Sequence, residues 1–229
     1  MPALSITANG IMPRYPEELS DQMKVLALPY GPLSSNLYVV ITEDGGFIVD
    51  PSVSPDKVLN LIEGFDLGVI KGIFATHAHY DHICCVGEWR KALPGVPFYL
   101  SAEDKPLLSD AYGNCSALIG RECLFDSVFE DVQDKMVFGN TTIDVIRTPG
   151  HTKGSVCYLV SSEGGSVLFT GDTVFAGSVG RTDFKGGSPV ELSESVNKIK
   201  GLDPRLAIYP GHGPDSTIGE EIRTNPYFA

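Results

Sequence analysis

The chain has 229 residues, of which 42% are hydrophobic and 20% charged, as is typical of a globular protein. Its formal net charge of −12 argues against a nucleic-acid partner, because affinity for nucleic acids comes largely from Lys and Arg that neutralise phosphates. No stretch approaches the roughly 18 apolar residues that a membrane-spanning helix needs, and residues 1–6 lack the start of a secretory signal. We therefore expect one domain over residues 1–229 in the cytoplasm, with no membrane or nucleic-acid partner. The sequence indicates no oligomeric state.

The cysteines are five, an odd number, and no Cys-x-x-Cys pair occurs among them. Neither a disulfide framework nor a zinc ribbon is predicted. We expect reduced thiols at Cys84, Cys85, Cys115, Cys123 and Cys157.

The predicted elements begin with three strands, which are rich in Val, Ile and aromatic residues and span residues 24–28, 36–42 and 46–50. The Gly-rich segment 43–46 predicts a hairpin turn between the second and third strands.

A helix is predicted next, because Ser54 can cap it and Pro55 suits its first position. It would place Val58, Leu59 and Ile62 on one buried face.

A short buried strand over 72–76 follows and ends where the first histidines begin. The segment 84–93 is expected to form a helix that carries Trp89 and ends at Pro94, and residues 97–100 form another strand.

The second half repeats this pattern, with strands predicted at 142–146, 156–160, 166–170 and 206–209 and a helix over about 189–199. Strands in both halves, with helices between and around them, favour two packed sheets covered by helices. The expected fold is therefore of the α/β class, a four-layer αββα sandwich.

The histidines occupy three places only: the run from His77 to His82, then His151 and His212. The run reads His-Ala-His-Tyr-Asp-His. Ordinary surface or core histidines would have to explain both this cluster and the lack of histidine elsewhere. Imidazole is the commonest protein ligand for transition metals, and carboxylates complete sites that also hold water. A metal site is therefore predicted.

Each candidate ligand follows a predicted strand. The histidine run follows the strand at 72–76, His151 and His212 follow two later strands, and Asp172 follows the strand at 166–170. Because rigid strands can aim loop residues at one rim, we expect these side chains to converge.

The seven candidate ligands divide into two groups with a bridge. One ion would be held by His77, His79 and His151, a second by Asp81, His82 and His212, and Asp172 could bridge the two. Each ion keeps an open position, as catalytic sites do. Nitrogen and oxygen ligands without thiolate favour Zn, Fe or Mn over a soft-metal site. We expect two divalent ions, with zinc first and iron or manganese as alternatives.

The sequence resembles the metallo-β-lactamase fold superfamily, whose pattern is H-x-H-x-D-H, a lone His, a bridging Asp and a final His. Four further segments resemble glyoxalase II-like (hydroxyacylglutathione hydrolase-like) members: 148–155 (TPGHTKGS), 169–173 (FTGDT), 180–184 (GRTDF) and 209–213 (YPGHG). The resemblance spans nearly the whole chain. It implies the αββα fold and a dinuclear site.

The resemblance implies a metallohydrolase that cleaves a small-molecule acyl thioester, such as an S-acylglutathione, or a related acyl bond. A hydroxide that bridges two ions would attack the carbonyl, and the metal charge would hold the resulting oxyanion. Asp81 could orient the nucleophile through its second oxygen. Arg181 lies where related enzymes often carry a basic residue near the substrate carboxylate, although it could instead pair with Asp183.

Three other functions stay open. Persulfide dioxygenases share this fold and bind one iron through three ligands, which correspond here to His77, His151 and Asp172. Lactonase or phosphodiesterase activity could use the same nucleophile, and a non-catalytic metal module would have closed coordination. True metallo-β-lactamases generally lack a bridging Asp, so Asp172 argues against that activity.

Two further positions flank the histidine run. Asp50 ends a strand, and it could support a ligand histidine or simply form a turn. Cys84 and Cys85 follow the run directly, and we expect them to pack as small apolar side chains rather than to approach the metals.

Overall fold

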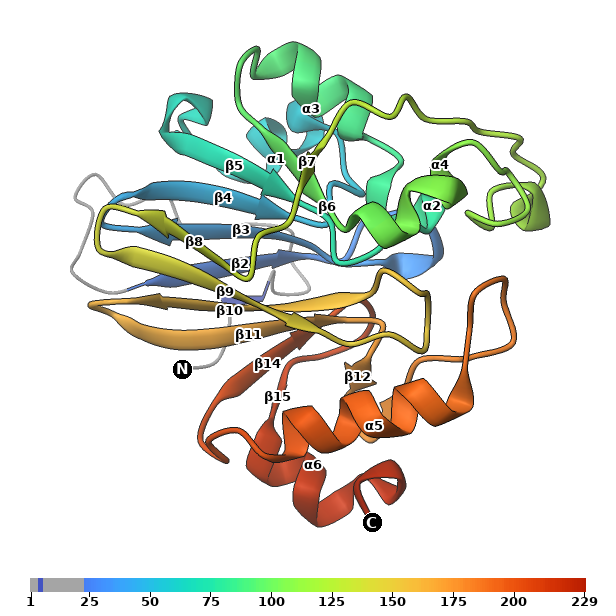
Figure 1. The fold of residues 1–229 in the computed structure, drawn as a ribbon. Helices are drawn as coiled ribbons and strands as arrows, with labels where there is room; N and C mark the ends of the chain where they lie inside the picture. The colour runs from blue at the N-terminus through green and yellow to red at the C-terminus, as the bar shows by residue number, and fades with distance from the viewer. Residues whose placement is uncertain (1–3, 6–22) are drawn as a thin grey trace.

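Two β-sheets pack face to face in the computed structural model, and helices cover both outer faces (Figure 1). The structure describes residues 4–5 and 23–229, so most of the N-terminal segment considered above for targeting lies outside the described residues. The first sheet has the strand order β1 (Leu4–Ser5), β2 (Lys24–Leu28), β3 (Leu37–Thr42), β4 (Gly45–Val49), β5 (Ile70–Phe74), β6 (Phe98–Leu100) and β7 (Glu130–Asp131).

The second sheet comes from the second half of the chain. Its order is β15 (Ser216–Thr217), β14 (Ala207–Pro210), β11 (Gly165–Gly171), β10 (Val156–Ser162), β9 (Thr141–Arg147) and β8 (Lys135–Phe138). A small hairpin, β12 (Val174–Phe175) and β13 (Ser178–Val179), stands beside it.

The helices are short except for one. They are α1 (Pro55–Leu61), α2 (Tyr80–Ile83), α3 (Val86–Ala92), α4 (Lys105–Leu108), α5 (Pro189–Lys200) and α6 (Ile218–Thr224). Short 3₁₀ turns are η1 (Pro32–Ser34), η2 (Leu67–Val69), η3 (Ala102–Asp104), η4 (Ala117–Ile119) and η5 (Pro226–Phe228).

The apolar core has three layers, and strand alternation explains them. In β3, Val39 faces the helices α1 and α3, whereas Tyr38 and Val40 face the second sheet. The space between the sheets is filled mainly by aromatic rings and valine side chains, and Phe74 packs against Tyr158 at a centroid distance of 5.3 Å. A third cluster lies between the second sheet and the helices α5 and α6. The predicted αββα sandwich is confirmed.

The nine predicted strands are present, with ends shifted by no more than two residues. The cap of α1 is also confirmed, because Ser54 Oγ accepts a hydrogen bond from the Lys57 amide. The predicted buried face of this helix is wrong in one residue. Val58 and Ile62 are buried, but Leu59 is exposed to solvent, because adjacent positions on a helix lie about 100° apart.

The predicted helix over 84–93 is shorter in the structure, where α3 covers Val86–Ala92 and a separate turn, α2, precedes it. Trp89 is fully buried, and its indole Nε1 donates to the Val53 carbonyl at 2.7 Å. This bond ties α3 to the segment before α1. Two further elements, β8 and α6, are not predicted from the sequence. Within the described part of the chain, no helix combines the length and apolarity needed to cross a membrane.

Candidate metal centre

The candidate ligands meet at one rim of the sandwich, where four strands end. His77 follows β5, His151 follows β9, Asp172 follows β11 and His212 follows β14. Their proximity is direct: the carboxylate of Asp172 lies 3.4 Å from His151 Nε2 and 3.7 Å from His212 Nε2. The structure thus brings both halves of the chain together at this rim, as the strand-end pattern predicts.

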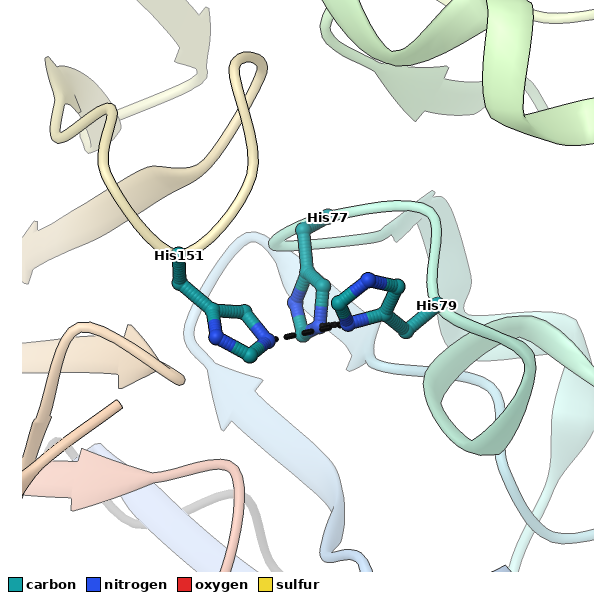
Figure 2. A group of neighbouring side chains, drawn as sticks. All are labelled: His77, His79 and His151. Carbon is teal, nitrogen blue, oxygen red and sulfur yellow. Dashed lines mark hydrogen bonds between the residues drawn. The ribbon is translucent and has the colours of Figure 1, made fainter. Parts of the chain in front are cut away.

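One group consists of three imidazoles, which point toward one another from two loops (Figure 2). His79 Nδ1 lies 3.1 Å from His77 Nε2 and 2.9 Å from His151 Nε2. All three rings are buried. This is the group expected to hold the first ion.

The second group lies beside it and mixes carboxylate with imidazole. Asp81 Oδ2 is 3.1 Å from His212 Nε2 and 3.5 Å from His82 Nε2. Asp172 lies between the groups, since its Oδ1 is 3.4 Å from His82 Nε2 while its Oδ2 faces His151 and His212. This is the position that a bridging carboxylate requires.

These donor atoms fit bound cations. With metal–nitrogen bonds of about 2.0–2.1 Å, neighbouring ligand atoms lie about 2.9 Å apart in octahedral and about 3.4 Å apart in tetrahedral coordination. The separations within both groups run from 2.9 to 3.5 Å, close to these values. Among the described residues, His82 Nε2 and Asp172 Oδ1 are also buried without a hydrogen-bond partner. Buried polar atoms that converge without hydrogen-bond partners fit a cation-binding site.

The two groups differ in protonation. Burial, together with the neighbouring imidazoles, holds the pKa values of His77 and His79 well below the ordinary range. Both rings are therefore neutral and ready to bind a metal. Burial also acts to lower the pKa of His82, but the carboxylates of Asp81, Asp172 and Asp50 outweigh it and raise that pKa to about 10. The carboxylates in and beside the second group thus favour a positive charge there.

Asp50 supports ligands from both groups. Its carboxylate accepts hydrogen bonds from His82 Nδ1 at 2.9 Å, from the Thr76 amide at 2.7 Å and from the Thr76 hydroxyl at 2.9 Å. Because the Thr76 hydroxyl donates its proton to Asp50, its oxygen accepts from His77 Nδ1, 3.1 Å away. Both histidines are thereby held with Nε2 free to bind an ion.

Asp104 is a supporting residue that the sequence analysis misses. Its buried carboxylate accepts from the amide of Ala78 at 2.9 Å, and from the Thr152 hydroxyl and the Gly154 amide at 2.8 and 2.7 Å. It therefore joins the first histidine loop to the loop of His151. No local signal marks this residue, because its partners lie 26 to 50 positions away in the sequence.

The last loop is fixed by close backbone packing. Gly211 lies against the carboxylate of Asp172 and the ring of His82, so closely that a Cβ would overlap Asp172. Asn36 holds the same loop, since its side-chain amide donates to the carbonyls of Pro210 and Gly213 at 2.9 and 3.0 Å. Nothing in the sequence marks Asn36 as part of the site.

A cavity of about 640 Å³ opens over the metal centre. Asp81, Asp172 and His212 line its floor, and the walls include Tyr80 and Cys115. Burial and the nearby Asp81 raise the pKa of the Cys115 thiol to about 11. Of the five cysteines, Cys115 lines this cavity; the pair after the histidine run lies elsewhere, with Cys84 Sγ donating to the Ser52 carbonyl at 3.3 Å.

Arg181 also lines the cavity, and its main chain supports the site. His151 Nδ1 donates to the Arg181 carbonyl at 2.7 Å, which leaves His151 Nε2 to face the other ligands. The guanidinium itself binds both carboxylate oxygens of Asp183 at 2.6 Å and lies 4.0 Å over the ring of Phe184. The ion pair with Asp183 is therefore formed, and a role of Arg181 toward substrate stays a prediction.

The comparisons with known proteins agree with this architecture. A sequence model of the metallo-beta-lactamase superfamily matches residues 30–212. The Bacillus subtilis protein called probable metallo-hydrolase YqgX is 33% identical over 210 residues, which cover 90% of this chain and 97% of YqgX.

Two crystal structures are similar as well. BLEG-1 B3 metallo-beta-lactamase has a TM-score of 0.80 at 34% identity, over 91% of this chain and 100% of its own. TTHA1623 in a di-iron-bound form has a TM-score of 0.76 at 35% identity, over 88% of this chain and 98% of its own. The chain described here belongs to the metallo-beta-lactamase superfamily.

Proposed function

We propose that this protein is a dinuclear metallohydrolase that cleaves thioesters or related acyl bonds. The observation that carries the proposal is the pair of donor groups with Asp172 between them. The relative YqgX carries the name of a metallo-hydrolase, and the similar TTHA1623 is described in a di-iron-bound form, which supports a site for two ions. Zinc is the expected metal, with iron or manganese as alternatives.

The ligand division follows the two groups in the structure. His77, His79 and His151 would hold one ion, Asp81, His82 and His212 would hold the other, and Asp172 would bridge them. Two divalent metal ions bound there would supply a water nucleophile at neutral pH and would polarise the substrate carbonyl as Lewis acids.

The chain's own residues position the reactants. Asp81 lies at the cavity floor with Oδ2 engaged by His212, and its other oxygen can orient the nucleophile. Because a thiolate is a good leaving group, the reaction requires no separate general acid. Asp81→Asn, with metal content measured, tests this role: lost turnover at unchanged metal content supports it.

The experiment that tests the function combines metal analysis with a panel of substrates. Purified protein is analysed for zinc, iron and manganese, then assayed with S-lactoylglutathione, a simple acyl thioester, a lactone and a phosphodiester. A β-lactam belongs in the panel because BLEG-1 is named a metallo-beta-lactamase. Two ions with thioester cleavage are expected. One iron per chain, with oxygen consumption in the presence of glutathione persulfide, would instead identify a dioxygenase.

A further inference from the structure

We propose that the cavity selects acyl thioesters whose acyl group is apolar and whose thiol part is uncharged, in preference to glutathione thioesters. This inference rests on the thioesterase function proposed above and names its substrate class. Three features of the cavity support it. Its walls are apolar, the apolar side chain of Leu33 is held over it, and the charge of Arg181 is compensated by Asp183.

The walls above the metal centre are apolar and come from separate parts of the chain. They include Leu33, Leu118, Ile119, Phe175, Val179 and Phe184. The leucine side chains are largely uncovered, with Leu33 67% and Leu118 55% exposed. An apolar group bound between them would remove this surface from water, and this stabilises the complex in proportion to the area covered.

Leu33 is presented on a strained turn that is fixed to the metal centre. Leu33 and Ser34 both have left-handed backbone conformations, with φ of 55° and 60°. Such strain persists only where the surroundings impose it, and it gathers at ligand-binding segments. The surroundings here are the site itself, since Ser35 Oγ donates to the Asp81 carbonyl at 2.7 Å and Ser35 forms a β-bridge with His212. The position of Leu33 over the cavity is therefore imposed by the same loops that carry the ligands.

The described side chains of the cavity wall offer no unpaired cation to an anionic thiol part. Histidines aside, Arg181 is the one cationic side chain among the described residues that line it, and Asp183 compensates its charge through two bonds of 2.6 Å. Glutathione carries two carboxylates and one ammonium group, so its thioesters bring a net negative charge that no free cation in this lining would meet. A neutral thiol part avoids this penalty.

The test uses the metal-loaded, full-length protein and two matched substrate series. Acetyl, butyryl, hexanoyl and octanoyl thioesters are made with N-acetylcysteamine, which is uncharged, and with glutathione. In the neutral series kcat/KM should rise about two- to fourfold per methylene until the cavity is filled. The hexanoyl thioester of N-acetylcysteamine should exceed that of glutathione by at least about tenfold. A flat dependence on chain length, or a preference for the glutathione series, would overturn the inference.

A matched pair of variants locates the effect. Leu33 and Leu124 are equally exposed, at 67% and 66%, but only Leu33 belongs to the cavity lining described above. Leu33→Ser should lower the ratio of hexanoyl to acetyl kcat/KM about five- to tenfold, whereas Leu124→Ser should leave it unchanged. The same ratio of hexanoyl to acetyl kcat/KM in both variants would refute the role of Leu33.

Binding separates this inference from the proposed function. If no thioester is cleaved, the proposed function fails, and the inference is then judged by calorimetry with two thioethers, S-hexyl-N-acetylcysteamine and S-hexylglutathione. Tighter binding of the neutral thioether supports the inference. Tighter binding of the glutathione thioether overturns it.

Discussion

Replacing Asp50 by Asn should weaken one ion site selectively. Asn has nearly the same volume and tolerates the left-handed backbone of this position, where φ is 54°. The change therefore isolates the charge and the acceptor capacity of the carboxylate. The Asp50 side chain is buried and accepts three hydrogen bonds, from Thr76 twice and from His82.

The expected loss of metal affinity follows from where the proton of the His82 ring lies when Asp50 is replaced. A single carbonyl oxygen does not suffice for all three donors, because the side-chain NH₂ group that Asp50→Asn introduces must face one or two of them. Where it faces His82 Nδ1, the ring proton moves to Nε2, the atom that would bind the ion. Loss of a carboxylate that supports a ligand histidine typically weakens metal binding about 10- to 100-fold, or about 1.4–2.7 kcal/mol. The ion near His82 should show this loss in full, and the three-histidine ion should show less.

The assay is metal titration against a chromophoric chelator, with metal content measured independently. Asp44→Asn is a matched control, since Asp44 Oδ2 also accepts three hydrogen bonds, from the amides of Asn140 and Thr141 at 2.9 and 2.8 Å and from the Thr141 hydroxyl at 2.9 Å. Asp44 lies in the hairpin between β3 and β4, at the opposite end of β4 from Asp50. Asp44→Asn should reduce stability without changing metal affinity. Two ions bound by Asp50→Asn with wild-type affinity would refute the reasoning.

Other predictions concern glycines and the Arg181–Asp183 pair. Gly211→Ala should destabilise the fold by about 1–3 kcal/mol and lower metal content, because its methyl group would overlap Asp172; normal metal content would contradict this. Gly87→Ala, in α3 with open space around its Cβ, should instead raise stability in thermal unfolding by about 0.4–1 kcal/mol. The hydrogen bonds from Arg181 lower the pKa of Asp183 to about 2. The pair should therefore stabilise the protein above pH 3.8 and lose this effect as the pH falls toward 2, and an NMR titration midpoint near 3.8 would show an open pair.

The seven candidate ligands are easier to recognise in the sequence than the residues that hold them in place. The seven candidates are recognisable because histidine is rare in this chain and each candidate follows a strand. Asp50 is recognisable by its place alone, since it directly follows β4. Asp104 carries no such mark, because its function depends on three contacts that only the folded chain creates.

The fold likewise has features that the local sequence predicts and features that depend on tertiary contacts. Strand alternation and the Ser-Pro start of α1 are local signals, and they place the elements within two residues. The buried side of α1 is narrower than predicted, because Leu59 lies about 100° around the helix from the buried Val58. The cavity walls are still less accessible to sequence analysis, since Leu118 and Ile119 lie in the short turn η4 and line the same cavity as Leu33 only in the folded chain.

The arrangement of the ligands has a mechanical consequence. Each donor group combines residues from the first sheet's loops with a histidine from the second sheet's loops, His151 in one case and His212 in the other. Bound cations would therefore act as cross-links between the two halves of the sandwich. Stripping them with a chelator should lower the melting temperature and loosen the rim first, so that metal supply governs the lifetime of the protein as well as its chemistry.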